Sequence, residues 1–139
     1  MIQFDYKPYI KTDKDGELIA IYYRPNAIIK LTNGNHSVTS NMIVDSGADI
    51  SIIPKSEGDL LGFRIEEGEE VKDISGIGGQ IPILYRTVDM FIGAENMKIK
   101  VAWALVDDLP PILGREDIFD NFNIEFRQKD KKIIFHKLQ

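Results

Sequence analysis

The sequence predicts an all-β protein, on the evidence of its strand-like runs, its turn residues and its shortage of helical patterns. Runs rich in β-branched and aromatic residues recur about every ten residues, as in folds made of many short strands. The predicted strands span residues 18–23, 27–32, 42–44, 81–92, 97–106 and 133–135. Only two short stretches look helical, so strands are expected to form both the framework and the core.

Turn residues separate these runs. Asn33-Gly34 lies between two apolar runs and predicts a type I′ hairpin, because both residues tolerate positive φ. Asp15-Gly16 and Lys129-Asp130 predict two further turns. Residues 1–23 and 124–139 are therefore each expected to contain a hairpin, one at either end of the chain.

The two helical stretches are short. Residues 116–122 place Ile118, Phe119 and Phe122 at helical spacing, which predicts a short helix near the C-terminus. Pro54 can begin a helical turn that runs toward residue 61, although Gly58 disfavours a helix. The charged stretch 66–70 is expected to be a solvated loop.

Composition limits the possible functions. The 139 residues fit a single domain, here residues 1–139, with a core of its own. With 17 basic and 22 acidic residues the net charge is −5, which does not favour nucleic-acid binding. The chain contains no cysteine, has no apolar run of membrane-spanning length and begins without a secretory pattern. A cytoplasmic protein without a membrane partner, cofactor or metal is expected.

Three isolated residues are assigned structural roles. His36 and His136 stand far from other ligand-type residues and are expected at the surface rather than at a metal or a catalytic centre. Trp103 lies in an apolar strand and is expected in the core.

The segment Asp45-Ser46-Gly47-Ala48-Asp49 carries the strongest functional signal. It directly follows the apolar run 42–44, so a strand would deliver Asp45 onto a tight turn. Alone the segment is not specific, because the same residue types form ordinary β-turns. Two later segments strengthen the signal: the glycine-rich stretch 74–79, which reads ISGIGG, and the stretch 112–117, which reads ILGRED.

In this order and spacing, the three segments resemble the retroviral-type aspartic proteases, or retropepsins. That family combines Asp-Thr/Ser-Gly-Ala with a glycine-rich flap and an apolar-apolar-Gly-Arg motif. The resemblance covers roughly residues 24–126 and implies an acid-protease-like closed barrel. Because Asp-Ser-Gly occurs once in this chain, it also implies a symmetric homodimer in which two Asp45 carboxylates meet. The terminal hairpins could extend the sheet or build the dimer contact.

The resemblance assigns roles to the motif residues. Asp45, Ser46 and Gly47 would form the catalytic turn, with the Ser46 hydroxyl bonding across the dimer axis. Ser46 replaces the more usual Thr and keeps the hydroxyl. Asp49 and Arg115 would form an intrachain pair that holds the loop, because a planar guanidinium can bind a carboxylate at two points.

Substrate contacts follow from the same resemblance. Ala48, Asp49 and the flap residues Gly76, Ile77, Gly78 and Gly79 are expected to bind an extended peptide. Ser75 replaces a family glycine, which predicts a less mobile flap. Apolar candidates for the pocket walls are Ala48, Ile50, Ile77, Ile81 and Ile112.

The expected function is therefore an aspartic endopeptidase that hydrolyses extended polypeptide with a water activated by an Asp dyad. The alternative is a weakly active or inactive module of the same fold that binds protein or mediates dimerisation. An intact Asp45-Ser46-Gly47 favours the enzyme, because a scaffold has no physical need to face two carboxylates across an axis.

Overall fold

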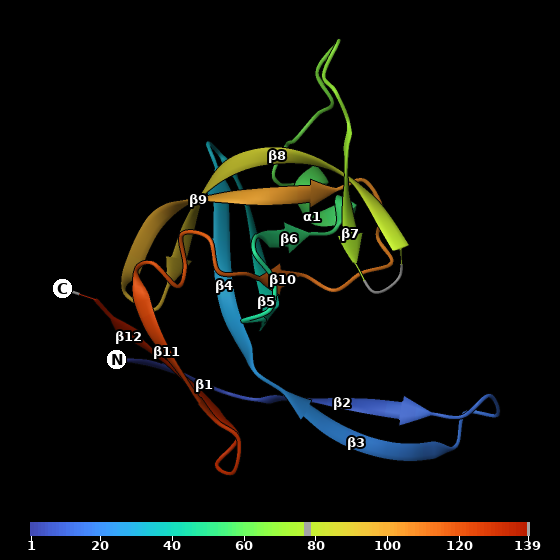
Figure 1. Cartoon of the computed structure of the whole chain (residues 1–139), viewed down its shortest axis with the longest axis vertical. Coiled ribbons are helices and arrows are strands. Elements are labelled where there is room, and N and C mark those ends of the chain that lie inside the picture. The colour runs from blue at the N-terminus through green and yellow to red at the C-terminus, as the bar shows by residue number, and fades with distance from the viewer. Residues whose placement is uncertain (77–78, 139) are drawn as a thin grey trace.

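The computed structural model describes residues 1–76 and 79–138 and consists mostly of strands (Figure 1). The strands are β1 Ile2–Asp5, β2 Lys7–Thr12, β3 Leu18–Arg24, β4 Asn26–Asn33, β5 His36–Val44, β6 Ser51–Ile53, β7 Lys72–Gly76, β8 Gly79–Ile92, β9 Glu95–Ala104, β10 Ile112–Leu113, β11 Phe122–Arg127 and β12 Lys132–Lys137. The one helix of the described residues is α1, Lys55–Leu60. The predicted all-β class is confirmed.

The largest sheet closes into a barrel of six strands. Its order is β4-β5-β10-β6-β9-β8, and β4 pairs with β8 to complete the ring. Strand β7 adds to β8 and forms a hairpin that leaves the barrel. β10 is only two residues long, yet it pairs in parallel with β5 on one side and antiparallel with β6 on the other.

Two smaller sheets involve the chain ends. β1 pairs with β12, and β12 pairs with β11, so the N-terminal segment joins the C-terminal hairpin. β2 and β3 form a separate two-stranded hairpin that projects from the rest of the molecule (Figure 1). Both terminal segments thus contain the expected hairpin.

The expected turn types are only partly correct. Hairpins turn at Asp15-Gly16 and Lys129-Asp130 as expected. The β4–β5 hairpin also forms, but Asn33 pairs with His36, so the two connecting residues are Gly34 and Asn35. Of these two only Gly34 has positive φ, at 60°, which excludes the type I′ turn. Asn33 remains in the ladder, where its side-chain amide donates to the Leu61 carbonyl at 2.9 Å.

The two expected helices have different outcomes. The helical turn after Pro54 is confirmed as α1. The helix expected over residues 116–122 is wrong, because residues 116–121 form successive turns and Phe122 begins β11. Asp117 adopts a left-handed φ of 69°, and its carboxylate accepts a 2.8 Å hydrogen bond from the Lys100 N–H. Ile118 and Phe122 are still buried, so the apolar spacing predicted burial but not the helix.

The core consists of a large and a small apolar cluster. The largest fully buried side chains, Trp103, Phe122 and Phe135, belong to the large cluster, as expected for Trp103. The small cluster comprises Ile52, Ile83, Ala102 and Ala104. Partly buried side chains, including those of Ile50, Ile74 and Tyr85, pack on this small cluster. Among the described residues, no helix is long and apolar enough to cross a membrane.

Candidate active site

Asp45 directly follows β5, at the end of a strand held on both sides. The Asp45 N–H donates to the Leu113 carbonyl of β10 at 3.0 Å, and the preceding Val44 N–H donates to Pro25 at 2.8 Å. Because β10 lies between β5 and β6, the turn that joins β5 to β6 must cross the end of β10. Barrel pairing therefore fixes where the turn begins.

The Asp45 carboxylate is held within its own turn. The Gly47 N–H donates to Asp45 Oδ1 at 2.8 Å, and the Ala48 N–H donates to the Asp45 carbonyl at 3.2 Å. A Cβ atom on Gly47 would lie 3.2 Å from Asp45 Oδ1, so a larger residue would press on the carboxylate. Asp45 is half-buried, whereas Ser46 and Gly47 are exposed.

Gly114 lies directly beneath this turn. A Cβ atom at position 114 would fall 2.5 Å from the carbonyl of Ile50 and 3.0 Å from the Ala48 oxygen. The backbone N–H of Gly114 donates at 3.0 Å to the hydroxyl of Ser51, which is fully buried. Only glycine permits two backbones to approach this closely, so the Gly-Arg motif packs against the Asp-Ser-Gly loop through main-chain atoms.

Asp49 and Arg115 form an ion pair between their side chains. The backbones are also joined, because the Arg115 N–H donates to Ala48 and the Glu116 N–H donates to Asp49, both at 2.9 Å. The side chains are 85% and 54% exposed, respectively, so the ion pair lies on the surface of the single chain. The backbone bonds therefore contribute more to holding the loop than the exposed charges do.

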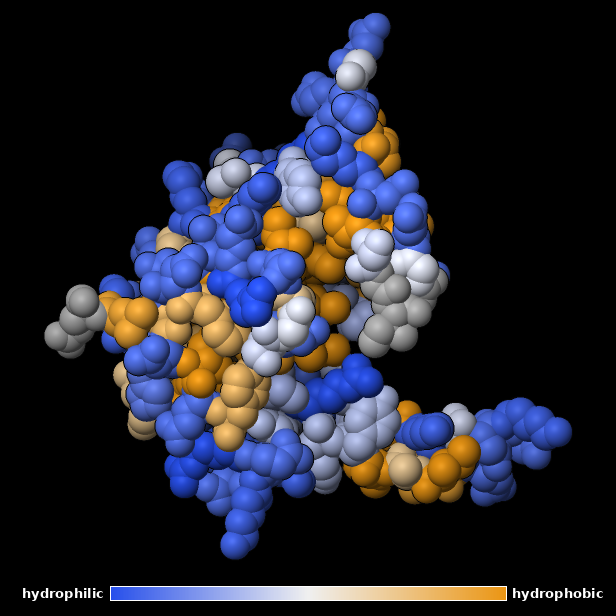
Figure 2. Space-filling model, in the orientation of Figure 1, coloured by the Kyte–Doolittle hydropathy of each residue, from blue (hydrophilic) through white to orange (hydrophobic). Residues whose placement is uncertain are grey.

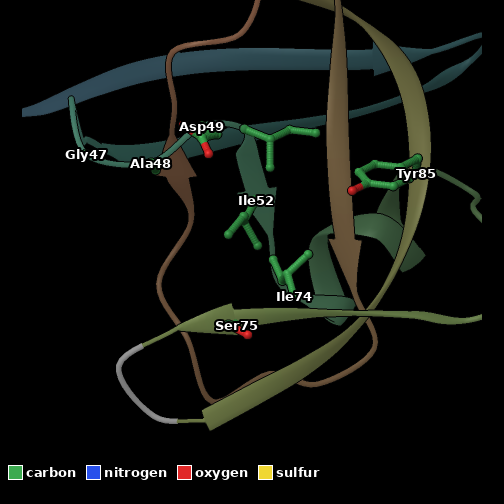
Figure 3. A pocket seen from close by; sticks show the side chains of 8 residues that line it. Gly47, Ala48, Asp49, Ile52, Ile74, Ser75 and Tyr85 are labelled. Carbon is green, nitrogen blue, oxygen red and sulfur yellow. The ribbon is translucent and has the colours of Figure 1, made fainter.

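A pocket of about 390 Å³ opens beside the turn (Figure 3). It is lined by Gly47, Ala48, Asp49, Ile50, Ile52, Ile74, Ser75 and Tyr85. In Figure 3 the aliphatic side chains of Ile52 and Ile74 and the ring of Tyr85 surround the cavity. The pocket lining thus combines apolar side chains with the polar groups of Asp49, Ser75 and Tyr85.

The β7–β8 hairpin borders this pocket through Ile74 and Ser75. Gly76 pairs with Gly79, and Gly79 has a φ of 107°, which strongly favours glycine. Ile77 and Gly78, expected to contact substrate, lie outside the described residues. The segment predicted to be a flap thus lies in a hairpin that borders the same pocket as Gly47, Ala48 and Asp49.

The other expected wall residues are distributed differently. Ala48 and Ile50 line the pocket, whereas Ile112 packs on the small apolar cluster. Ile81 lines a second pocket of about 290 Å³. Its other lining residues are Gln80, Pro82, Val106, Asp108, Leu109 and Pro110.

The loop at residues 64–71 is anchored to β8 by an ion pair. Arg86 Nη1 lies 2.6 Å from Glu69 Oε2, and Arg86 Nη2 lies 2.8 Å from Glu69 Oε1. The hydrogen bonds from Arg86 hold the pKa of Glu69 at about 2. Arg86 also donates to the Arg64 carbonyl at 2.7 Å. The expectation of a simply solvated loop is therefore wrong for Glu69, because its partner is distant in sequence.

Four residues at the candidate site were not predicted from the sequence: Ser51, Ile52, Ile74 and Tyr85. The sequence offered one signal, since Ser51 is a polar residue within the apolar run 50–53. Tyr85 belongs to the long strand β8, whose sequence does not reveal which residues face the pocket.

The two histidines behave as expected: His36 is exposed, and His136 lies 3.0 Å from Glu125 at the surface. Within the described part of the chain, no cluster of three or more acidic or histidine side chains could hold a metal ion.

Comparison with solved structures defines the fold. A retropepsin-like aspartic protease from Rickettsia conorii superimposes with a TM-score of 0.62 at 20% identity, over 96% of this chain and 99% of the other. EIAV protease complexed with the inhibitor HBY-793 gives a TM-score of 0.54 at 24% identity, over 70% and 86% of the two chains. No family model and no curated protein matches the sequence. The chain has the retropepsin-like fold.

Proposed function

We propose that this protein is an aspartic endopeptidase that acts as a homodimer. The observation that carries the proposal is the position of Asp45 at the end of β5, held by the Gly47 N–H and by β10 beside the substrate-sized pocket. Such a turn presents one carboxylate, and metal-free peptide hydrolysis by this chemistry requires two. The second is supplied by Asp45 of another copy across a two-fold axis.

Two facing carboxylates share one proton. At about 4 Å and an effective dielectric constant near 20, two negative charges repel by about 4 kcal/mol, so the pair retains one proton. The ionised Asp45 accepts a proton from water while the protonated one donates to the peptide carbonyl oxygen. The product of this step is a tetrahedral diol. Ser46 bonds across the axis and aligns the two turns.

The substrate lies extended between the catalytic turn and the β7–β8 hairpin. Its backbone bonds the flap residues 76–79 and Asp49, while its side chains enter pockets on alternate sides. Ile50, Ile52 and Ile74 favour an apolar side chain in the pocket. Closure of the hairpin excludes water from the reacting carbonyl. Arg115 pairs with Asp49 and holds the loop.

The rival proposal is a module of the same fold that binds extended segments without cleaving them. It predicts peptide binding in the same pocket and no turnover. The decisive substitution is Asp45→Asn, because an amide can neither take nor share the proton. Cleavage of an unfolded, fluorescently labelled protein should fall by about a hundredfold or more.

The matched control is Asp59→Asn, which removes an exposed carboxylate paired with Lys55 on α1 and should leave cleavage unchanged. Circular dichroism should report the same fold for both variants. Residual cleavage by Asp45→Asn above about a hundredth of wild type contradicts the assignment. Peptide binding without cleavage by wild-type protein supports the rival instead.

A further inference from the structure

The β2–β3 hairpin, called the arm below, has large apolar side chains in solvent. Ile10, Leu18, Ile19 and Ile21 are between 53% and 67% exposed, and Tyr23 is 42% exposed. A two-stranded hairpin is at best marginally stable in water without a further layer of structure. Within the described residues the arm pairs only with itself, and it projects away from the barrel (Figure 1).

The register of the arm separates its residues onto two faces. Pro8 pairs with Tyr23, and Ile10 pairs with Ile21, so these four side chains share one apolar face. Leu18 and Ile19 extend the apolar surface at the bulge near the tip. Figure 2 shows this apolar surface along the arm and the hydrophilic tip beyond it. The exposed apolar area is on the order of 500 Å², as large as patches that mark interaction sites.

On the opposite face of the arm, the side chains contact one another. Tyr9 and Tyr22 stack with ring centroids 5.7 Å apart, and the Arg24 guanidinium lies 5.0 Å from the Tyr9 ring. At the tip, Asp13 Oδ1 accepts hydrogen bonds from the backbone N–H groups of Asp15 and Glu17. The arm is therefore a preformed element whose apolar face is left open except at Tyr23, where Lys131 Nζ lies 4.9 Å from the centre of the ring.

The root of the arm adjoins the strand that carries Asp45. Asn26, directly after the arm, is 2% exposed, and its amide donates to the Tyr9 hydroxyl at 2.9 Å. Asn26 also pairs with Ile43 of β5, and Pro25 accepts from Val44, the residue before Asp45. A molecule that meets the Asp45 turn is therefore within reach of the arm.

We propose that the apolar face of the arm packs against a second copy of this chain. This inference rests on the proposed function, because that function identifies the binding partner. The catalytic site is incomplete until Asp45 of a second copy lies beside the first, near the root of the arm. Charge favours the same occupant. Residues 7–24 carry four basic and three acidic side chains, which gives the arm a net charge of +1. The rest of the chain contains 13 basic and 19 acidic residues and has a net charge of −6. A slightly basic arm thus meets an acidic body.

The available area agrees with this assignment. Each arm has on the order of 500 Å² of apolar surface and would bury an equal area on its partner. Two reciprocal contacts would then bury on the order of 2,000 Å² in total, and stable interfaces bury roughly 1,600 Å². One arm bound to a short peptide would bury far less. Reciprocal packing of two copies is the arrangement that covers both apolar faces.

Sedimentation equilibrium tests the proposal in an Asp45→Asn background, in which cleavage cannot alter the sample. The variant Ile10→Thr/Ile21→Thr keeps strand-forming residues in the arm and removes its central apolar pair. The dimer dissociation constant should rise roughly tenfold or more. Ile65→Thr, which changes a 54% exposed residue in the loop at residues 64–71, is the matched control and should leave it unchanged. An unchanged constant in the arm variant overturns the proposal, as does a monomeric parent chain at all concentrations.

A second measurement remains informative if the arm variant unfolds. Because the chain has no cysteine, Ile21→Cys and Ile65→Cys each accept one photo-reactive maleimide. Cross-linked dimers should form from position 21 and not from position 65. Cross-links from position 21 only to an added unfolded protein would assign the arm to substrate capture and overturn the proposal. An Ile21→Cys dimer that retains Asp45, cross-links through the arm and does not cleave would refute the enzyme and leave this interface standing.

Discussion

The Gly114 N–H donates a 3.0 Å hydrogen bond to the Ser51 hydroxyl, and both residues are buried. This bond connects the Gly-Arg motif with β6, the strand that follows the Asp45-Ser46-Gly47 turn. It thereby fixes the loop that contains Asp45 from below. Removal of the hydroxyl would leave a buried backbone donor without its partner.

Ser51→Ala should therefore destabilise the protein by about 1–3 kcal/mol, the usual cost of an unsatisfied buried polar group. Urea unfolding followed by tryptophan fluorescence measures this change, since Trp103 is in the core. Ser37→Ala, at an exposed position of β5, is the control. Equal stability of the two variants would show that the Ser51 bond is not important.

Gly114→Ala should be more damaging than its small size implies. The new methyl group would lie 2.5 Å from backbone atoms of Ile50, so one of the two chain segments must move. Overpacking of this kind costs about 1–3 kcal/mol or more. Cleavage should fall as well, because the displaced segment joins Asp45 to β6. A variant with wild-type melting temperature and activity would contradict this packing.

The Asp49–Arg115 pair should contribute little to the stability of a single chain. Both side chains are more than half exposed, and such pairs are typically worth less than about 1 kcal/mol. A double-mutant cycle with Asp49→Asn and Arg115→Lys, measured on dilute monomer, gives the coupling energy. A coupling near 3 kcal/mol would contradict the exposure of the pair in the single chain.

Stability should decline in acid partly through Glu69. Its pKa is lowered to about 2 by Arg86, below the ordinary value of 4.5, so the folded state favours the ionised carboxylate. The resulting stabilisation is present above pH 4.5 and is lost as pH falls toward 2. The stability difference between wild type and Glu69→Gln should shrink over this window in urea titrations. The exposed neighbour Glu67→Gln should show no such loss.

Glu57 should act in the opposite direction. Burial raises its pKa above the ordinary 4.5, and the Ser40 hydroxyl offsets the shift in part. The folded state therefore binds this proton more tightly, so its contribution is present below pH 4.5 and is lost as pH rises through the folded pKa. Glu57→Gln should be more stable than wild type at pH 7, with a smaller difference at pH 4. An equal difference at both values would contradict the role of this proton.

The sequence predicted those elements whose pattern is local. Long runs of β-branched residues identified β3, β4, β8 and β9 to within about two residues. β10 could not be identified in this way, because two residues carry no period and its pairing depends on β5 and β6. Tertiary contacts, not local preference, determine that strand.

Gly58 and Asp117 show why the helices were harder to predict than the strands. Gly58 disfavours a helix by propensity, yet α1 needs it, because a Cβ there would lie 2.1 Å from Trp103 Nε1. Asp117 ends the helical geometry after Gly114-Arg115 through a bond to Lys100, 17 residues away. The motif Asp-Ser-Gly was recognisable in sequence, whereas the pocket residue Tyr85 was defined only by the folded barrel.

The pairing of β1 with β12 has a consequence for biosynthesis. Ile2 lies opposite Phe135 and Phe4 opposite Ile133, so β1 has no partner until β12 has been synthesised. Until then β1 remains unpaired, and the adjacent arm is also rich in exposed apolar residues. Contacts of such long sequence separation form slowly. The pairing of β1 with β12 is therefore expected to form late in folding.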